Sequence, residues 1–355
     1  MATSRSRDRT VEGEWGRTLS SSEKVKTMFS AIYIESEVRH HPRARELLAR
    51  HRDLPHIECE RHGEIFNRKS QNFRLQKEQP ALILARKHGR KVLPAPAGYG
   101  FDAAASHYFS HMLNCVYDCR YCFLQGMYRS AHCVLFVNYE DFTESIRQTI
   151  AAGPGHQVFY SGYDCDSLAL EPVSGFASHF VPFFAQHPGA TLELRTKSTQ
   201  VASLLRLRPI PNCVIAMSFT PAVAAARWEH GVPSIEKRLA ALGRLQRAGW
   251  PVALRFEPLL QDQSPRAHEE LFELVFSRLD TGRLHSVSTG EFRMPADYFR
   301  NTLKLYPDEP LFARETQTAG GVVTFRPSRR DSWLEQVESS LFRHIDPARY
   351  YRCAN

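Results

Sequence analysis

The stretch His111-Met-Leu-Asn-Cys115-Val-Tyr-Asp-Cys119-Arg-Tyr-Cys122-Phe-Leu-Gln-Gly-Met127 holds three of the eight cysteines of this 355-residue chain, at the spacing C-x3-C-x2-C. Thiols gathered at such short spacing indicate metal ligation. Three thiolates can hold three corners of a [4Fe–4S] cluster and leave one iron open, and soft sulfur ligands favour iron–sulfur over hard metals. The stretch therefore predicts a cluster held by Cys115, Cys119 and Cys122.

Two other interpretations of the cysteines stay open at this point. A tetrahedral zinc site would need a fourth ligand, for which His107 or His111 is the nearest choice. A buried structural trio is the other alternative. The N-terminal residues 1–10 are polar and basic and lack the apolar region of a signal peptide, so we expect a cytoplasmic protein in which thiols stay reduced.

Composition sets further bounds. A hydrophobic content of 43% and a charged content of 24% are typical of a globular protein. No apolar run approaches the roughly 18 residues of a membrane span, so no membrane association is expected. The net charge of +8 is compatible with a polyanionic partner such as nucleic acid, and equally with a basic surface that serves solubility alone.

The chain divides into four predicted parts. Residues 1–26 have few apolar side chains and predict a disordered tail. Residues 27–100 predict a small α/β extension, 101–300 a larger domain, and 301–355 a C-terminal segment. Within the extension we expect strands at 28–35, 56–59, 80–87 and 91–94, a helix at 43–52 and a linker at 94–100.

From residue 105 onward, short apolar runs alternate with helical patterns, which predicts parallel βαβ units. Six strands in one series fit an incomplete barrel, although an open doubly wound sheet has the same pattern. The expected strands are 108–111, 157–160, 191–195, 213–218, 252–256 and 285–288. The expected helices are 142–151, 173–186, 199–205, 234–248 and 268–277.

Polar side chains follow these predicted strands at their C-terminal ends, which is the active-site face of a β/α barrel. The cysteine stretch comes directly after the first of the strands. Arg255 and Glu257 share one face of the fifth strand, where they predict either an ion pair or a ligand contact. The other strand-end residues are Arg195, Lys197, Ser218 and Arg293.

The cysteine stretch resembles the radical S-adenosylmethionine (SAM) superfamily, whose hallmark is C-x3-C-x2-C with an aromatic residue, here Tyr121, before the last Cys. The resemblance implies an α/β fold, a partial (β/α)6 barrel. It also implies a [4Fe–4S] cluster whose open iron binds the amino and carboxylate groups of SAM. In that superfamily a reduced cluster cleaves SAM, and the resulting 5′-deoxyadenosyl radical abstracts hydrogen from the substrate.

Longer stretches resemble the spore photoproduct lyase family, which reverses a methylene-bridged thymine dimer in DNA with SAM as a recycled cofactor. The resemblance implies damaged DNA as substrate and an electron donor such as ferredoxin or flavodoxin. The matching stretches are Ile32-Tyr-Ile-Glu-Ser-Glu-Val38, Asn67-Arg-Lys-Ser-Gln-Asn-Phe-Arg-Leu-Gln-Lys77, Ser110–Gln125, Phe136-Val-Asn-Tyr-Glu140 and Asp166-Ser-Leu-Ala-Leu-Glu171.

The resemblance assigns roles residue by residue. Cys115, Cys119 and Cys122 match the cluster ligands, and Tyr121 matches a tyrosine beside the cluster and SAM. Lys197 is similar to a basic residue near the SAM carboxylate and Ser218 to a serine that contacts SAM. Phe123 and Arg255 complete the expected cofactor-binding set.

Two departures fall on the step that returns the radical. The family has a tyrosine after the last cluster Cys, where this chain has Phe123, and a hydrogen-donating cysteine where this chain has Tyr163. Cys165 lies two residues further on and is the remaining candidate donor, so Tyr121, Tyr163 and Cys165 form the predicted catalytic set. Cys59, Cys133, Cys213 and Cys353 are expected to be packing or surface residues.

These departures leave three functions open. The first is a carbon–carbon lyase that repairs a thymine-dimer-type lesion in DNA. The second is a radical SAM enzyme that acts on another nucleic acid or on a substrate other than DNA. The third is a non-enzymatic iron–sulfur module that binds nucleic acid.

Overall fold

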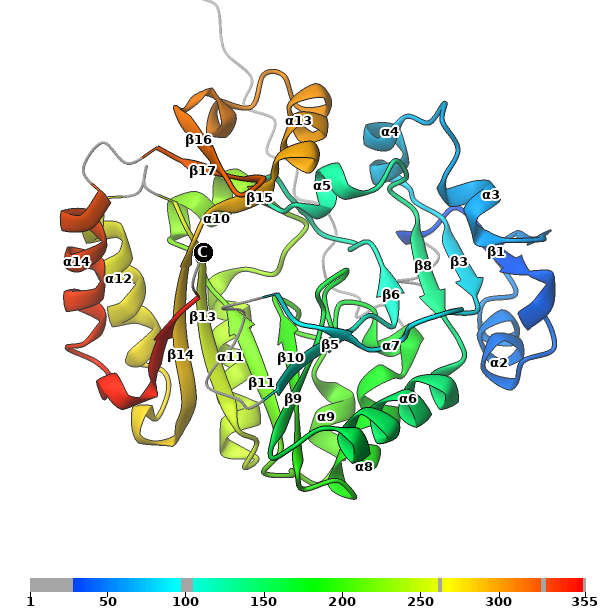
Figure 1. The fold of residues 1–355 in the computed structure, drawn as a ribbon, viewed down its shortest axis with the longest axis horizontal. Helices are drawn as coiled ribbons and strands as arrows, with labels where there is room; N and C mark the ends of the chain where they lie inside the picture. Colours follow the sequence, from blue (N-terminus) through cyan, green and yellow to red (C-terminus); the bar gives the residue numbers. More distant parts are fainter. Residues whose placement is uncertain (1–27, 97–104, 261–263, 327–329, 354–355) are drawn as a thin grey trace, which may run out of the picture.

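The computed structural model describes residues 28–96, 105–260, 264–326 and 330–353 (Figure 1). The predicted tail at 1–26 and positions 97–100 of the predicted linker lie outside the described residues. Within the described ranges, no helix has both the length and the apolar character needed to cross a membrane.

A curved eight-stranded sheet forms the body of the molecule, in the order β18-β14-β13-β11-β10-β9-β5-β4 (Figure 1). Among the described residues its edge strands β18 and β4 do not pair with each other, so the sheet forms an incomplete barrel. The six strands from β5 to β14 in this sheet are mutually parallel, which confirms the predicted series. They are β5 (Ala105–Phe109), β9 (Gln157–Ser161), β10 (Ala190–Thr196), β11 (Cys213–Ser218), β13 (Val252–Leu259) and β14 (Leu284–Glu291).

Helices follow these strands and cover the outer face of the sheet (Figure 1). They are α6 (Tyr139–Ala152), α7 (Glu171–Ser174), α8 (Phe176–Ala185), α9 (Ala202–Arg206), α11 (Ile235–Arg247) and α12 (Pro265–Phe276). The Ser234 side chain accepts a hydrogen bond from the backbone N–H of Lys237 and so caps α11. The single helix predicted at 173–186 is two helices, because Gly175 has a φ of 58° and ends α7 in the left-handed conformation.

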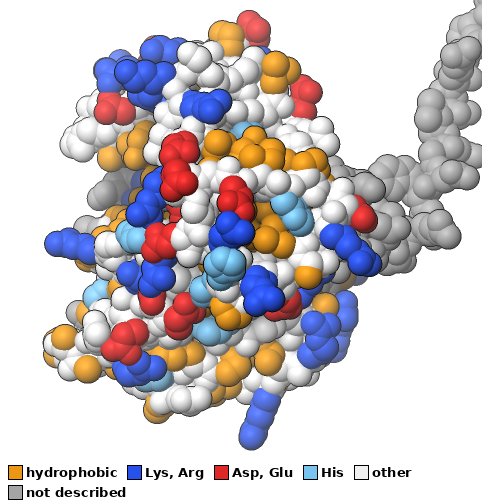
Figure 2. All heavy atoms as spheres, turned by 90° about the vertical axis from the view of Figure 1, so that its right-hand side faces the viewer, with side chains coloured by type: hydrophobic (Ala, Val, Ile, Leu, Met, Phe, Trp, Pro, Cys, Tyr) orange, Lys and Arg blue, Asp and Glu red, His pale blue; other side chains and the backbone are white. Residues whose placement is uncertain are grey.

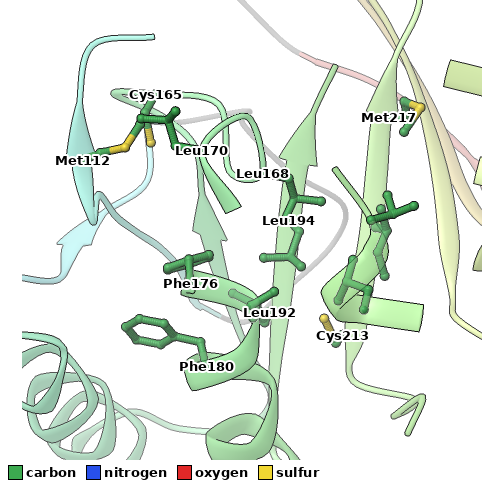
Figure 3. Packing of buried hydrophobic residues seen from close by; sticks show 14 of the residues in the cluster. Met112, Cys165, Leu168, Leu170, Phe176, Phe180, Leu192, Leu194, Cys213 and Met217 are labelled. Carbon is green, nitrogen blue, oxygen red and sulfur yellow. The ribbon is translucent and has the colours of Figure 1, made fainter. Parts of the chain in front are cut away.

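The main core lies between the sheet and these helices. Figure 3 shows Phe176 and Phe180 of α8 gathered near Leu192 of β10, and Cys165 beside Met112. The rings of Phe176 and Phe180 are 4.6 Å apart between centroids. Large aromatic side chains such as these bury much apolar area each, so they fix the helices on the outside of the sheet.

A second sheet has the order β2-β1-β3-β8-β6 and carries the N-terminal helices. Its elements are β1 (Ile32–Glu35), α2 (Pro42–Arg50), β2 (His56–Cys59), α3 (His62–Phe66), α4 (Phe73–Glu78), β3 (Leu82–Ala85), β6 (Met112–Leu113) and β8 (Cys133–Phe136). The face that these N-terminal elements present to solvent carries basic, acidic and His side chains interspersed (Figure 2).

The two sheets exchange segments across the expected boundary at residue 100. β4 (Leu93–Pro94) comes from the predicted extension and pairs antiparallel with β5 in the curved sheet. In the other direction, β8 pairs with β3 and so joins the N-terminal sheet. The division of the chain into four parts remains a prediction, since strands on either side of residue 100 pair with strands of the other predicted part.

The C-terminal segment closes both the top and one edge of the curved sheet (Figure 1). β18 (Tyr350–Arg352) pairs parallel with β14 and is the last strand at that edge. β15 (Arg293–Pro295) and α13 (Ala296–Leu305) lead from the curved sheet into this segment, which also contains β16 (Thr316–Ala319), β17 (Val322–Phe325) and α14 (Arg330–Leu341). The short elements around the cysteines are β7 (Asp118–Cys119), α5 (Leu124–Met127), α10 (Ala222–Trp228) and β12 (Glu229–His230).

Candidate active site

A cavity of about 250 Å³ opens at the C-terminal ends of the parallel strands. Strand ends β9, β10, β11, β13 and β14 each contribute lining residues, as the barrel geometry requires. The lining residues used below are Cys115, Cys119, Tyr121, Cys122, Phe123, Tyr163, Cys165, Lys197, Ser218, Glu257, Arg293 and Cys353. These residues come from seven separate parts of the chain and meet in one cavity.

Residues 115–122, which hold the three cysteines, are called the cysteine segment here, and Asn114 makes the turn that leads into it. Asn114 has a φ of 71°, in the left-handed region that asparagine tolerates better than most residues. Its side-chain amide donates to the carbonyl oxygens of Ser130 and His132, at 2.6 and 2.9 Å, and these bonds hold the turn. Cys119 then pairs with Glu229 where β7 meets β12. The segment is thus anchored at both ends.

The three cysteines fit a [4Fe–4S] cluster by the chemistry of the donor set. All three line the cavity and none is in a disulfide. Across the described ranges, no three His, Cys, Asp or Glu side chains are arranged around one metal ion. Each thiolate of a cluster binds a different iron, so a cluster does not require that arrangement.

The zinc alternative with a nearby histidine does not fit the structure. Neither His107 nor His111 lines the cavity. His111 is buried and stacks on Phe176 with ring centroids 3.9 Å apart, and burial lowers its pKa to about 3. His107 stacks on Phe159. His111 is therefore a buried residue of the fold, and His107 is a half-buried residue on β5.

Glu229 is the centre of a buried polar network that the sequence pattern did not reveal. One of its carboxylate oxygens accepts from the hydroxyls of Tyr121 and Thr220, and the other accepts from Arg238 at 2.8 Å. Burial on its own raises the pKa of Glu229, but Lys197, Arg238 and the hydroxyl donors outweigh burial and hold this pKa below its usual range. Glu229 is therefore a carboxylate that ties the cysteine segment to the barrel.

Lys197 and Ser218 lie where the sequence placed them, on the cavity wall after β10 and at the end of β11. The Lys197 ammonium is 3.9 Å from Glu229 and 5.4 Å from the centre of the Tyr121 ring. Asp166 fixes the chain here, because it accepts from the backbone N–H of Lys197 at 2.7 Å. The arrangement places one cation beside the cysteines.

Aromatic rings form another wall of the cavity. Phe123 packs on Tyr163 with centroids 5.3 Å apart, and Tyr163 packs in turn on Tyr108 at 4.6 Å. Phe123 precedes α5, which lies directly against α13. A Cβ atom on Gly126 would lie 1.9 Å from the carbonyl oxygen of Tyr298, so only glycine permits this approach.

Two thiols other than those of the cysteine segment reach the cavity. Cys165 is buried both against the main core and on the cavity wall, and burial raises its pKa well above the usual range. Cys353 follows β18, lines the same cavity and donates to Glu257 at 3.2 Å. Burial, followed by the charge of Glu257, raises the pKa of Cys353 to about 12. Both side chains are therefore protonated thiols at neutral pH.

Cys353 was expected to be a packing or surface residue; it is buried and also lines the cavity. No local pattern marks this cysteine, because it reaches the cavity only through the pairing of β18 with β14. The other three cysteines, Cys59, Cys133 and Cys213, are buried away from the cavity, as expected.

Arg255 does not line the cavity, so its position does not support the predicted contact with a cofactor. It is fully buried and donates to Glu193 at 2.8 Å and to Ser286 at 3.1 Å. The expected ion pair with Glu257 is also wrong, because Glu257 pairs with Arg195 at 3.3 Å. The period of two placed Arg255 on the correct strand and could not identify its partner on β10.

A family model described as spore photoproduct lyase matches residues 28–293. The chain belongs to the spore photoproduct lyase family. The match covers the N-terminal sheet, the cysteine segment and every strand of the curved sheet except β18. It confirms the family expected from the sequence and, with it, a radical SAM enzyme of the lyase class. None of the curated proteins compared with the chain matches it.

Solved structures of spore photoproduct lyase share the fold. The complex with dinucleoside spore photoproduct has a TM-score of 0.78 and 17% identity, and the match covers 92% of this chain and 99% of that one. A mutant with bound AdoMet and dinucleoside spore photoproduct has a TM-score of 0.76 and 18% identity, with 92% and 98% covered. A cysteine-to-alanine mutant has a TM-score of 0.79 and 18% identity, with the same coverage.

Proposed function

We propose that this member of the spore photoproduct lyase family repairs a thymine-dimer-type lesion in DNA with SAM and a [4Fe–4S] cluster. One observation supports the proposal most strongly. Cys115, Cys119 and Cys122 share a single cavity with a cation, a strand-end serine and a wall of aromatic rings. A solved family structure carries both AdoMet and dinucleoside spore photoproduct, which agrees with a site for two ligands.

The cavity residues fall into two groups, those that would hold the cluster and those that would contact SAM. The three cysteines would hold the cluster, and when bound with SAM this group supplies the electron that cleaves SAM to a 5′-deoxyadenosyl radical. Lys197 is placed to pair with the SAM carboxylate, and the Ser218 hydroxyl is placed to hydrogen-bond SAM. Tyr121 is held by Glu229 beside these groups and presents its ring to the same space.

The lesion would enter along the aromatic wall. Phe123 and Tyr163 offer flat faces on which a base can stack, as side chains do in flipped-base and single-strand sites. Arg293 lines the same cavity and can contact a phosphate. These contacts would position the lesion close to the cysteines.

In this proposal, Cys165 donates the hydrogen atom that quenches the carbon radical of the lesion. Its buried thiol lies on the cavity wall and stays protonated, so an S–H bond is available to a carbon radical of the lesion. Transfer of that hydrogen atom forms a C–H bond and leaves a sulfur radical on Cys165. Tyr163 lies two residues before Cys165 and would supply the phenolic group for the next transfer, because Phe123 has none.

The decisive experiment uses the anaerobically reconstituted protein, reduced chemically and incubated with SAM and dinucleoside spore photoproduct. We expect the lesion to be converted back to two separate, intact thymidine residues, and we expect 5′-deoxyadenosine to be detected. If 5′-deoxyadenosine forms and the lesion stays unrepaired, the protein is a radical enzyme with another substrate. If the lesion stays unrepaired and no 5′-deoxyadenosine forms, the proposal is wrong.

A second candidate function keeps the cofactors and changes the substrate. Phe123 and Tyr163 favour it, since both replace groups that the family uses to return the radical. Under this alternative the aromatic wall would bind a different nucleic acid or a compound other than DNA. Turnover of SAM in the presence of other damaged oligonucleotides separates the two candidates.

A further inference from the structure

The cysteine segment lies between two hollows, the active-site cavity and a second one on the opposite side, and contributes residues to both. Between Cys115 and Tyr121 the odd-numbered residues line the active-site cavity, and the even-numbered residues line a second hollow of about 310 Å³. The first set is Cys115, Tyr117, Cys119 and Tyr121, and the second is Val116, Asp118 and Arg120. Cys122, which follows this run, also lines the cavity.

We call the second hollow the basic groove. It is lined by Arg74 and Lys77 of α4 and by Arg120, against the two carboxylates of Glu78 and Asp118. Asp118 is already paired with Arg120, at 2.6 Å. Within the described ranges, no carboxylate forms an ion pair with Arg74 or Lys77. The groove is therefore positive and has cations available for a partner.

The rim of the groove combines charge with apolar surface. The Tyr306 ring lies in the groove, with the Arg120 guanidinium 4.2 Å and the Arg74 guanidinium 5.6 Å from its centre. Leu75 follows Arg74 on α4 and is 62% exposed, although it does not line the groove itself. Protein interfaces typically combine apolar or aromatic side chains with a charged rim.

Lys77 belongs to both hollows. Its ammonium donates to the backbone carbonyl of Cys115 at 2.6 Å, and it lines the cavity as well as the groove. A molecule seated in the groove would lie against Val116, Asp118 and Arg120, whereas Cys115 and Cys119 line the cavity. No other part of the groove lining is shared with the cavity.

We propose that the basic groove is the docking site of a small acidic carrier protein that delivers one electron across the cysteine segment. The proposal rests on the proposed function, which requires such an electron. The reduced carrier loses one electron and the cluster gains it, so no bond forms and no proton moves. DNA is the other polyanion that a positive groove could attract. The lesion, however, must reach Phe123 and Tyr163, which lie on the cavity side of the segment.

Binding tests the site directly. We expect oxidised flavodoxin, titrated by its flavin fluorescence, to bind the reconstituted protein more weakly as ionic strength rises. Arg74→Glu places a like charge opposite an acidic partner and should raise the Kd roughly tenfold. Arg45→Glu on α2 is the matched control, because Arg45 is also exposed and lies away from the groove. Equal Kd values for the two variants, or no binding to the unaltered protein, overturn the proposal.

The rate of 5′-deoxyadenosine formation with two different reductants tests the docking proposal independently of the proposed repair function. With dithionite as reductant, the Arg74→Glu variant should form 5′-deoxyadenosine at the unaltered rate. With reduced flavodoxin, its rate should fall by a factor similar to the rise in Kd. If dithionite supports no turnover in any variant, the proposed function fails while the binding result still stands. If Arg74→Glu weakens binding of a damaged oligonucleotide and leaves flavodoxin binding unchanged, the groove is a DNA contact and the proposal is wrong.

Discussion

The hydroxyl of Tyr121 donates a hydrogen bond to the carboxylate of Glu229, which lies 108 residues further along the chain. The bond joins the cysteine segment to the residue that directly follows α10. Glu229 also pairs with Arg238, whose side chain donates to the Ser218 carbonyl at 2.8 Å. The cysteine segment and the end of β11 are thus connected through one buried carboxylate.

Replacing Tyr121 with Phe tests this connection. The change removes one donor to a buried charged group, which typically costs about 1–3 kcal/mol of stability. The expected result is a lower free energy of unfolding in urea for the metal-free protein. Tyr33→Phe is the control, since the described residues show no hydrogen bond from the Tyr33 hydroxyl. Equal stability of the two variants would mean that the Tyr121 bond contributes nothing.

Arg255 gives a prediction that separates structure from ligand binding. Arg255→Met leaves the buried Glu193 short of one of its two cations, and breaking a buried pair costs roughly 3–5 kcal/mol. We expect a large loss of stability with an unchanged Kd for SAM, measured by calorimetry on the folded variant. A selective loss of SAM affinity would restore the role that the sequence predicted for this arginine.

Acid sensitivity follows from the same pair. Burial raises the pKa of Glu193, but Arg255 and Arg195 outweigh burial and lower this pKa to about 2. Since the unfolded chain has the higher pKa, the unfolded state binds more protons between the two values. Stability from Glu193 is therefore present above about pH 5 and is lost as the pH falls, by an amount on the order of 3 kcal/mol.

The measurement is the free energy of unfolding as a function of pH. Glu193→Gln should flatten the fall in stability between about pH 5 and pH 3. The slope is the relevant quantity, because the variant also leaves Arg255 without its counter-charge. Glu335→Gln, at an exposed position on α14, should keep the slope of the unaltered protein. A Glu193→Gln slope equal to that of the unaltered protein would refute the assignment.

The strands and cluster cysteines could be predicted because their signals are local. Alternating apolar runs mark the six parallel strands, and the spacing of Cys115, Cys119 and Cys122 marks the metal site. Glu229 and Cys353 could not be predicted, since both reach the site through pairing with residues distant in sequence. β12 pairs with β7 across 110 residues of chain at the Glu229–Cys119 position, and β18 pairs with β14.

Phe123 yields a prediction about how the radical is handed on. Phe123→Tyr adds a hydroxyl beside Tyr163, whose ring lies 5.3 Å away between centroids. If radical return limits SAM recycling, the ratio of 5′-deoxyadenosine formed to lesion repaired should fall several-fold in this variant. Tyr163→Phe should raise the same ratio, because it removes the phenol nearest to Phe123. An unchanged ratio in both variants would exclude these two positions from the relay.

The two cavity thiols can be ranked by their products. Cys165→Ala should leave the lesion radical without its hydrogen-atom donor. By-products of the unquenched radical should therefore increase relative to repaired thymine residues. Cys353→Ala should change the product ratio less, because the Cys353 thiol already donates its hydrogen to Glu257. Cys213→Ala controls for loss of a buried thiol, since Cys213 is buried and does not line the cavity. A larger effect from Cys353→Ala than from Cys165→Ala would assign the hydrogen return to the C-terminal strand.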